Sequence, residues 1–363
     1  MDPEISKSGE TKNKREFASL LDYAIEKGAS DIHIQHDSPP MVRIGGQLTA
    51  MDLPVYTPEK CNEIIGYFIG EERVTKLVET KAEQDFAFSY ENLRFRCNIF
   101  FQRGVMAASL RLLPNKIRTM DELGLPTVIQ EMANQNQGFL IVAGPTGHGK
   151  STTLASILNH IASERSGHII TIEDPIEYVF SNKKSIVVQR ELGADTPSFS
   201  SALRAALRED PDVVLVGEMR DLETMQAALE IAQTGHLVLT TLHTNSAAQT
   251  ANRIIDVFPP HQQDQIRVML AEVLLGIVSQ RLLPKVQGGR ALVTEILVAN
   301  PAVRSLIREA KTHQIPNVIQ TSASEGMVSL DKSLADLVNK GELALQDALA
   351  WSLDPKVLKT MVY

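Results

Sequence analysis

Residues 139–153 read FLIVAGPTGHGKSTT, and this stretch decides the fold of the second part of the chain. Its first five residues are apolar, as in a strand that is buried on both faces. Gly144 to Ser151 fit the pattern G-x-x-x-x-G-K-[ST], and a helix-forming run follows. The glycines of such a loop let backbone N–H groups converge on phosphate oxygens in front of a helix N-terminus. The stretch predicts a nucleoside triphosphate site, for ATP with Mg²⁺, in an α/β domain.

Individual residues of this loop have distinct expected roles. Lys150 supplies a positive charge for the β- and γ-phosphates, and the Ser151 hydroxyl is placed to ligate Mg²⁺. We expect the imidazole of His148 to point to solvent, with a pH-dependent hydrogen-bond donor as the alternative. The expected nucleotide-binding set is Gly144, Thr146, Gly147, His148, Gly149, Lys150, Ser151 and Thr152.

Carboxylates at strand ends form the second part of the predicted site. Glu218 follows the apolar run Val213–Val216, at the strand end where ligands bind in open α/β sheets. A glutamate there suits reach toward a water molecule, and it is also a candidate for the metal site. Glu173 and Glu177 belong to a strand exit with three carboxylates in five residues. Repulsion among such groups indicates a cation nearby, and a polar loop is the alternative interpretation.

A polar segment after a further apolar run adds a histidine to these candidates. Thr240 to Asn245 carry hydroxyl, imidazole and amide groups that suit hydrogen bonds to a γ-phosphate. His243 is the candidate residue in this segment. A lone histidine is more often structural, so the residues alone leave its role open.

Hydrophobic patterning divides the chain into two domains. Strict alternation over 93–99 predicts a strand, and the segment 16–113 is an α+β domain with a mostly antiparallel sheet. Continuous apolar runs that alternate with amphipathic helices predict a mainly parallel sheet in 127–363, with a helical part from about Pro301. We interpret 1–15 as a mobile polar tail and 114–126 as the linker between the domains.

Composition excludes several classes of protein. The chain has 36 Lys and Arg against 44 Asp and Glu, a net charge of −8, which disfavours nucleic acid as a partner. The two cysteines exclude a four-cysteine zinc site or a disulfide framework, and they fit a reducing compartment. The first residues have no apolar core of a signal peptide. We therefore expect a soluble, cytoplasmic protein.

In combination these motifs resemble the secretion-superfamily ATPases. The phosphate loop, the acidic box Glu173–Glu177, the segment VGEMRD ending at Asp221 and the box TLHTN follow in the order of that family. The opening segment GASDIH is also similar to its N-terminal domain. Ala302–Glu309, which read AVRSLIRE, are similar to a C-terminal motif of the type IV pilus retraction ATPases within the family. The resemblance covers about Phe17 to the end of the chain.

The resemblance implies a fold, an assembly and a function. It implies a PAS-like N-terminal domain and a RecA-like ATPase domain in a homo-hexamer. This motor would power pilus disassembly and twitching motility at an inner-membrane platform protein, on the cytoplasmic face. It implies that Glu218 is the catalytic glutamate, that Glu177 and Glu173 form the acidic box, and that His243 is the histidine-box residue. Candidates to reach the site of an adjacent subunit are Arg94, Arg96, Arg103 and Arg111.

Other functions stay open at this point. An accessory paralogue of the retraction motor, acting as its nucleotide-gated binding partner, fits the departures at His148, Val303 and Ser305 from the family pattern. The absence of a four-cysteine module disfavours the related pilus-extension and secretion motors. A DNA-translocating motor is disfavoured by the net charge and by the absence of a basic-aromatic stripe.

Overall fold

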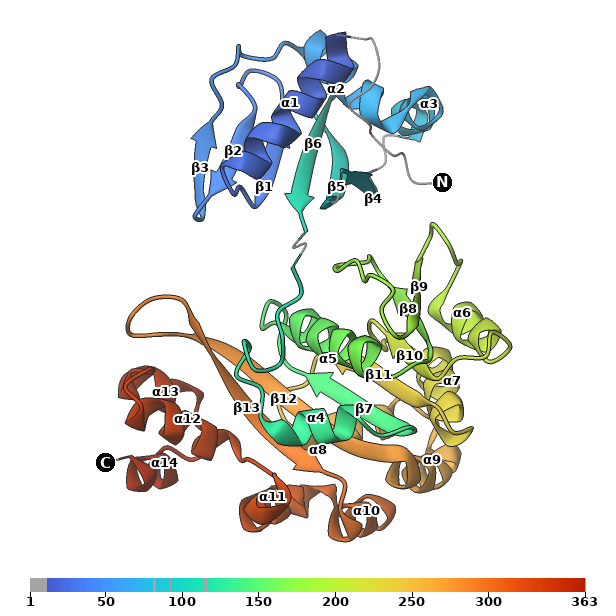
Figure 1. The fold of residues 1–363 in the computed structure, drawn as a ribbon, viewed down its shortest axis with the longest axis vertical. Helices are drawn as coiled ribbons and strands as arrows, with labels where there is room; N and C mark the ends of the chain where they lie inside the picture. Colours follow the sequence, from blue (N-terminus) through green and yellow to red (C-terminus); the bar gives the residue numbers. More distant parts are fainter. Residues whose placement is uncertain (1–11, 81–82, 92, 114–115, 363) are drawn as a thin grey trace. The chain divides into compact units, whose positions relative to one another are not determined.

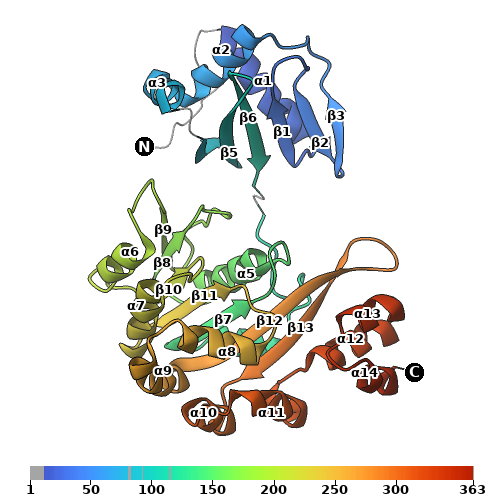
Figure 2. The ribbon, with the colours of Figure 1, turned by 180° about the vertical axis from the view of Figure 1, so that it is seen from behind.

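The computed structural model describes residues 12–80, 83–91, 93–113 and 116–362 (Figures 1 and 2). They divide into two compact units, the first made of the residues up to Lys116 together with Pro175–Val179 and the second of the other residues. The division falls within the segment 114–126 that we interpret as a linker. Helix α1 begins at Lys12, so the predicted polar tail 1–15 is wrong for residues 12–15. The rest of that tail lies outside the described residues. No helix in the described ranges is long and apolar enough to cross a lipid bilayer.

The first unit contains a six-stranded antiparallel sheet in the order β3-β2-β1-β6-β5-β4. This arrangement confirms the predicted antiparallel α+β class. The strands are β1 (Asp31–Ile34), β2 (Met41–Ile44), β3 (Gln47–Ala50), β4 (Gln84–Tyr90), β5 (Leu93–Gln102) and β6 (Val105–Leu112). The helices are α1 (Lys12–Glu26), α2 (Pro58–Ile69) and α3 (Glu71–Thr80).

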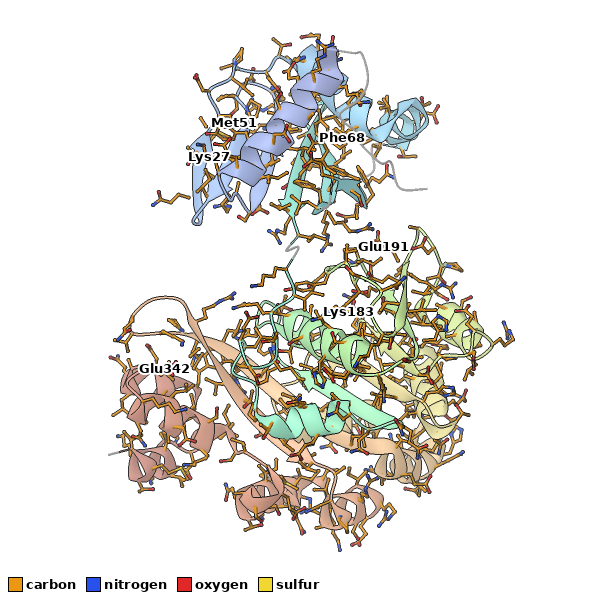
Figure 3. All side chains as sticks on the ribbon, in the orientation of Figure 1. Lys27, Met51, Phe68, Lys183, Glu191 and Glu342 are labelled. Atoms are coloured by element: carbon orange, nitrogen blue, oxygen red, sulfur yellow. The ribbon has the colours of Figure 1, made fainter. Side chains whose placement is uncertain are left out.

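Alternation along β5 separates the two faces of this sheet. Phe95, Cys97 and Ile99 are fully buried in a core that they share with α1 and α2. Phe17 of α1 stacks on Phe68 of α2 with ring centroids 4.5 Å apart (Phe68 is labelled in Figure 3). On the opposite face of the sheet β5 places Arg94, Arg96 and Asn98, as the period of two predicts.

The second unit contains a seven-stranded sheet in the order β13-β12-β7-β11-β10-β8-β9. All neighbours are parallel except β12 and β13, which form an antiparallel hairpin at one edge. This confirms the mainly parallel sheet. The strands are β7 (Gly138–Ala143), β8 (His168–Glu173), β9 (Ile186–Glu191), β10 (Val213–Val216), β11 (Leu237–Leu242), β12 (Leu274–Pro284) and β13 (Arg290–Val298).

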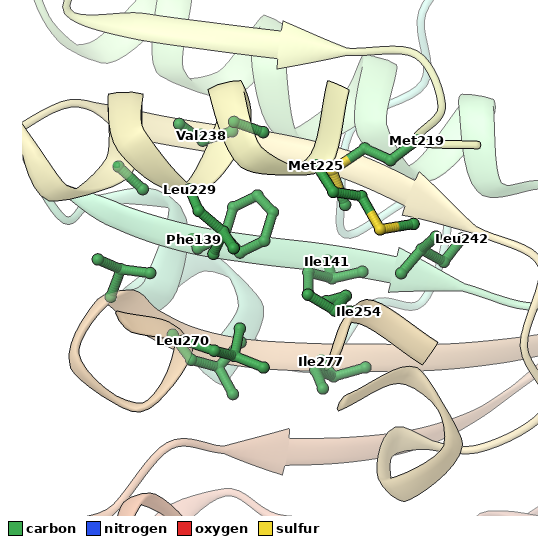
Figure 4. Close-up of a cluster of buried hydrophobic side chains, with 14 of the residues drawn as sticks. Phe139, Ile141, Met219, Met225, Leu229, Val238, Leu242, Ile254, Leu270 and Ile277 are labelled. Carbon is green, nitrogen blue, oxygen red and sulfur yellow. The ribbon is translucent and has the colours of Figure 1, made fainter. Parts of the chain in front are cut away.

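Helices cover both faces of the parallel sheet. Phe139 and Ile141 of β7 point into a core with α6 (Phe199–Ala206), α7 (Leu222–Gln233), α8 (Ala247–Asp256) and α9 (Pro260–Val273), part of which Figure 4 shows. Leu140 and Val142, which alternate with them, point into a second core with α4 (Thr127–Ala133) and α5 (Lys150–Glu164). Burial on both sides explains why these strands are continuous apolar runs.

The C-terminal segment is helical, as predicted. Its α-helices are α10 (Pro301–Arg308), α11 (Ile315–Thr321), α12 (Leu330–Asn339), α13 (Leu345–Trp351) and α14 (Pro355–Met361). The last three helices pack on the β12–β13 hairpin through a small apolar cluster that includes Leu283, Val293 and Leu334. These helices therefore lie against the strand that neighbours β7.

We expect Phe139→Ala to lower the free energy of unfolding by about 3–5 kcal/mol, because it leaves a cavity in the core between β7 and α7. Urea denaturation followed by far-ultraviolet circular dichroism measures the change. Val286→Ala, at a side chain that is 63% exposed, is the control and should stay within about 0.5 kcal/mol of the parent chain. Equal effects of the two changes would contradict the assigned core.

Candidate functional site

The phosphate loop joins β7 to α5, as the motif predicts. Gly144, Gly147 and Gly149 all have positive φ angles, of 149°, 80° and 83°. A Cβ at Gly144 would lie 2.4 Å from the carbonyl oxygen of Gln280 in β12, so the loop backbone is in close contact with that strand. Only glycine permits both the backbone conformation and the close approach at this position.

Helix α5 begins in a form that suits an anion. Its N-cap residue Gly149 is in the left-handed region and provides no side-chain cap. The first N–H groups of a helix have no partner within the helix, and here no capping side chain accepts from them. Ser151 and Thr152 lie in this first turn and are half-buried. Backbone amides, hydroxyls and the helix dipole are thus directed to one place.

Lys150 is held against the loop that it follows. Its side chain is buried, and Nζ donates hydrogen bonds to the carbonyl oxygens of Gly144, at 2.8 Å, and Pro145, at 3.0 Å. Nζ also lies 3.4 Å from Nδ1 of His243. The ammonium group is therefore already placed at the phosphate loop.

His243 and Glu218 come from neighbouring strands and meet beside this lysine. His243 follows β11, and its Nδ1 is 3.4 Å from Oγ1 of Thr146 as well as from Nζ of Lys150. Its Nε2 faces Oε2 of Glu218 at 3.5 Å. Donation by Lys150 to Nδ1 assigns the ring proton to Nε2, on the side of the carboxylate. Four of the predicted site residues are thus brought together.

The pKa of His243 is lowered from its ordinary value. Burial is the largest cause, and the positive charge of Lys150 adds to it, while the charge of Glu218 acts in the opposite direction. The ring is therefore neutral at physiological pH. A neutral imidazole accepts at one nitrogen and donates at the other, which is what its two neighbours require.

The backbone around Glu218 is fixed from three sides. Gly217 donates its N–H to the carbonyl oxygen of Ile172 at 2.8 Å, and its own carbonyl accepts from Oγ1 of Thr241 at 2.6 Å. Asp221, the last residue of the VGEMRD segment, caps α7 by accepting the N–H of Thr224 at 2.8 Å. The Glu218 side chain is 13% exposed, and Oε1 pairs with Nη2 of Arg220 at 2.6 Å.

The two residues of the acidic box lie in different surroundings. Glu173 is buried at the end of β8, where Oε1 accepts from Oγ1 of Thr171 at 2.6 Å and Nε2 of Gln189 at 3.1 Å. Its Cα is 3.3 Å from the position that a Cβ on Gly217 would occupy. Glu177 is exposed in the following loop. Glu173 therefore lies directly behind the Glu218 segment, and Glu177 belongs to the short segment Pro175–Val179 that groups with the first unit.

The structure contradicts the expectation that His148 points to solvent. Nδ1 of His148 accepts the backbone N–H of Leu282 in β12 at 2.9 Å. The His148 carbonyl accepts from Nε2 of Gln280 at 2.7 Å, and the ring contacts Trp351 of α13 edge-on at 5.8 Å. The pKa of His148 is lowered by burial and by nearby cations, of which Arg281 contributes most. The imidazole thus fastens the phosphate loop to β12.

A cavity of about 600 Å³ lies beside the start of α5, and sequence analysis did not find it. Gly149, Thr152 and Thr153 form its wall on the side of the phosphate loop. Residues from 118 to 124, from the β12–β13 hairpin and from the end of α12 complete it, among them Glu342, which Figure 3 labels. The segments that line the cavity are far apart in the sequence, so no local pattern predicts that they meet. The glycine pair 288–289 indicates a turn between two strands and no more.

The arginines of the first unit do not form a single cluster. Arg96 of β5 and Arg111 of β6 are exposed and directly opposite each other in the sheet, on the same face as Arg94. Nε of Arg111 donates to Oδ1 of Asp31 at 2.8 Å. Arg103 lies in the β5–β6 turn, seven residues from Arg96, or about 24 Å along an extended strand. Arg103 therefore does not join the other three.

The candidate site offers oxygen donors to a metal ion. The described part of the chain has no group of three or more His, Cys, Asp or Glu side chains arranged to hold a metal ion. Ser151 and Glu218 offer the hydroxyl and carboxylate oxygens that Mg²⁺ prefers, and Mg²⁺ takes its other ligands from nucleotide phosphates and water. The residues present fit a metal ion that binds together with a nucleotide.

Comparison with known proteins gives one family match, two similar relatives and one similar solved structure. A family model described as type II/IV secretion system protein matches residues 7–288. The type IV pilus retraction ATPase PilT of Pseudomonas aeruginosa is 45% identical over 92% of this chain and 97% of that protein. The type IV pilus ATPase PilU of the same organism is 38% identical over 96% of this chain and 91% of that protein. A crystal structure of the pilus retraction motor PilT with bound ADP has a TM-score of 0.89 at 50% identity, covering 94% of this chain and 98% of that one.

We expect Gly144→Ala to weaken ADP binding about tenfold or more, because the added Cβ would separate the phosphate loop from the carbonyl of Gln280. Calorimetric titration with ADP measures the affinity. Gly66→Ala is the control, because a Cβ there meets only an ordinary contact, 3.5 Å from Val74. An unchanged affinity of Gly144→Ala would show that the loop does not need its contact with β12.

Proposed function

Because this chain belongs to the type II/IV secretion system protein family, we propose that it is an ATP-hydrolysing motor that powers type IV pilus retraction and twitching motility. The family likeness also confirms the predicted fold class, a RecA-like ATPase domain with an N-terminal α+β domain and a helical C-terminal part. The observation that carries the proposal is the convergence of Lys150, His243 and Glu218 at the phosphate loop.

In the proposed mechanism, the phosphate loop binds and orients the triphosphate. The first N–H groups of α5 donate hydrogen bonds to the phosphate oxygens, and Lys150 exchanges its bonds to the loop carbonyls for bonds to the β- and γ-phosphates. Ser151 and Glu218 would hold Mg²⁺, which when bound neutralises charge on the phosphates. Positioning and electrostatic stabilisation account for most of the catalysis in reactions of this type.

Glu218 is the proposed residue that orients the attacking water. Its carboxylate lies at the carboxyl end of β10. Arg220 contacts one carboxylate oxygen, Oε1, and His243 faces the other, Oε2. A carboxylate so fixed accepts a proton or hydrogen bond from water without first having to be ordered. His243, neutral and in contact with Thr146 and Lys150, is the proposed link between the carboxylate and the phosphate loop.

We propose further that the motor is a homo-hexamer at the cytoplasmic face of the inner membrane, in contact with a pilus platform protein. Arg94, Arg96 and Arg111 form the polar face of the N-terminal sheet, and they suit a role at the site of an adjacent subunit. Arg103 fits that role less well, because it lies at the opposite end of β5. Glu177 remains a proposed acidic-box residue on the ground of the resemblance.

The accessory paralogue is the second candidate function. Its support is that His148, Val303 and Ser305 depart from the family pattern. Identity to PilU is 38%, against 45% to PilT, and does not favour this alternative. A paralogous retraction ATPase is therefore proposed as a possible partner of this motor rather than as its identity.

We expect Glu218→Gln to bind ATP and to lose about 10²- to 10⁴-fold in turnover, because the amide cannot take a proton from water. Phosphate release and calorimetric ATP binding measure the two effects. Glu230→Gln, at an exposed carboxylate of α7, is the matched control and should keep full activity. Lys150→Ala should differ from Glu218→Gln in that it no longer binds ATP. Near-normal hydrolysis by Glu218→Gln would refute the assigned role.

We expect a strain that lacks this protein to assemble surface pili and to lose twitching, because pili would extend without being retracted. Twitching zones and electron microscopy of surface pili measure the two properties. The wild-type gene and Glu230→Gln should restore twitching, and Glu218→Gln should not. Normal retraction in the deletion strain would argue against the main motor and for the accessory paralogue.

A further inference from the structure

The single tryptophan of the chain contacts two segments of the candidate nucleotide site. Trp351, the last residue of α13, lies 5.8 Å from the His148 ring at an interplanar angle of 63°. The guanidinium carbon of Arg281 in β12 lies 5.7 Å from the centre of the same indole. One side chain of the C-terminal helices thus touches both the phosphate loop and the strand beside it.

Arg281 extends this contact to the loop that carries His243. Its Nη2 donates to the carbonyl oxygen of Asn245 at 2.8 Å, two residues after His243. Arg281 is only 5% exposed, and its Nε and Nη1 are buried without a hydrogen-bond partner among the described residues. A buried guanidinium that lacks such partners gains from an aromatic face, so the indole is part of its solvation.

Helix α13 is well placed to move with this contact. It buries only Ala348, and the Trp351 side chain stays 39% exposed. The chain just after Trp351 is tied to α12 by Asp331, whose carboxylate accepts from Oγ of Ser352 at 2.7 Å and from the N–H of Leu353 at 3.0 Å. These hydrogen bonds connect the residues that follow Trp351 to α12. We therefore expect α12 to move when the indole moves.

We propose that His148 is a positioning residue that links the phosphate loop to the C-terminal helices through Trp351. Its two contacts divide the task. Nδ1 holds the loop to the Leu282 N–H, and the ring edge meets the indole. Rearrangement of the loop on nucleotide binding then displaces the indole, and displacement of the helices alters the loop. The inference rests on the proposed function only in that the loop binds nucleotide.

Trp351 is the only tryptophan of the chain, so the tryptophan fluorescence of the protein reports on its contact with His148. We expect the emission of Trp351 to change when ADP is added, with the same midpoint as binding measured by calorimetry on the full chain. Absence of calorimetric binding would overturn the proposed function. Binding without any change in emission would overturn the present inference and leave the proposed function intact.

Two variants of His148 separate its contacts. His148→Asn places an amide oxygen near the position of Nδ1 and removes the ring, so it should bind ADP more tightly than His148→Phe does and lose the emission response. His148→Phe keeps a ring and removes the acceptor, so it should keep the response and bind ADP about tenfold more weakly. A full response in His148→Asn, or unchanged affinity in His148→Phe, would overturn the assignment.

A variant on the helix tests the link from the other side. Trp351→Ala should change the KM for ATP by about two- to tenfold, although the described lining of the cavity does not include this residue. Trp351→Phe keeps an aromatic edge, so its KM for ATP should be close to that of the parent chain. A KM unchanged in Trp351→Ala, with the thermal midpoint also unchanged, would show that the contact does not reach the nucleotide site.

Discussion

The parallel register between β7 and β11 is the constraint on which the candidate site depends. Ala143 lies opposite Leu242, and the N–H of Gly144 donates to the carbonyl oxygen of Leu242 at 3.2 Å. The phosphate loop and the segment of His243 therefore leave the sheet at the same level. A shift of one residue would turn every side chain of β7 to the opposite face and separate Lys150 from His243. Burial of β7 on both faces makes such a shift costly, so the cores stabilise the site as well as the fold.

Much of this arrangement could be predicted because it is local in sequence. The strand, loop and helix of residues 139–153 are adjacent, and the apolar runs before Glu218 and His243 end where polar residues begin. Parallel strands bring such ends to one edge, so the meeting of these residues follows from the pattern. The bounds of α2 are marked locally in the same way, because Thr57 caps its start and Gly70 follows its end.

Other features could not be predicted because they depend on pairing between distant segments. Strand β12 begins at Leu274, directly after α9 ends at Val273, and neither residue is a glycine or proline that would mark the change from helix to strand. Without that strand, neither the acceptor role of His148 toward Leu282 nor the cavity beside α5 was visible. Likewise, the position of Arg96 directly opposite Arg111 became clear only from the cross-strand register.

The pairing of Arg96 with Arg111 has a consequence for the stability of the first unit. Like charges directly opposite each other in a sheet repel, and here Arg111 has the carboxylate of Asp31 beside it. The buried residues on the reverse of β5 keep the two strands together against this repulsion. Added salt screens this repulsion, so the pairing of β5 with β6 becomes more stable as ionic strength rises, whereas exposed ion pairs become weaker. A phosphate or carboxylate of another molecule that binds between Arg96 and Arg111 would reduce the same repulsion, so binding there would stabilise the pairing of β5 with β6.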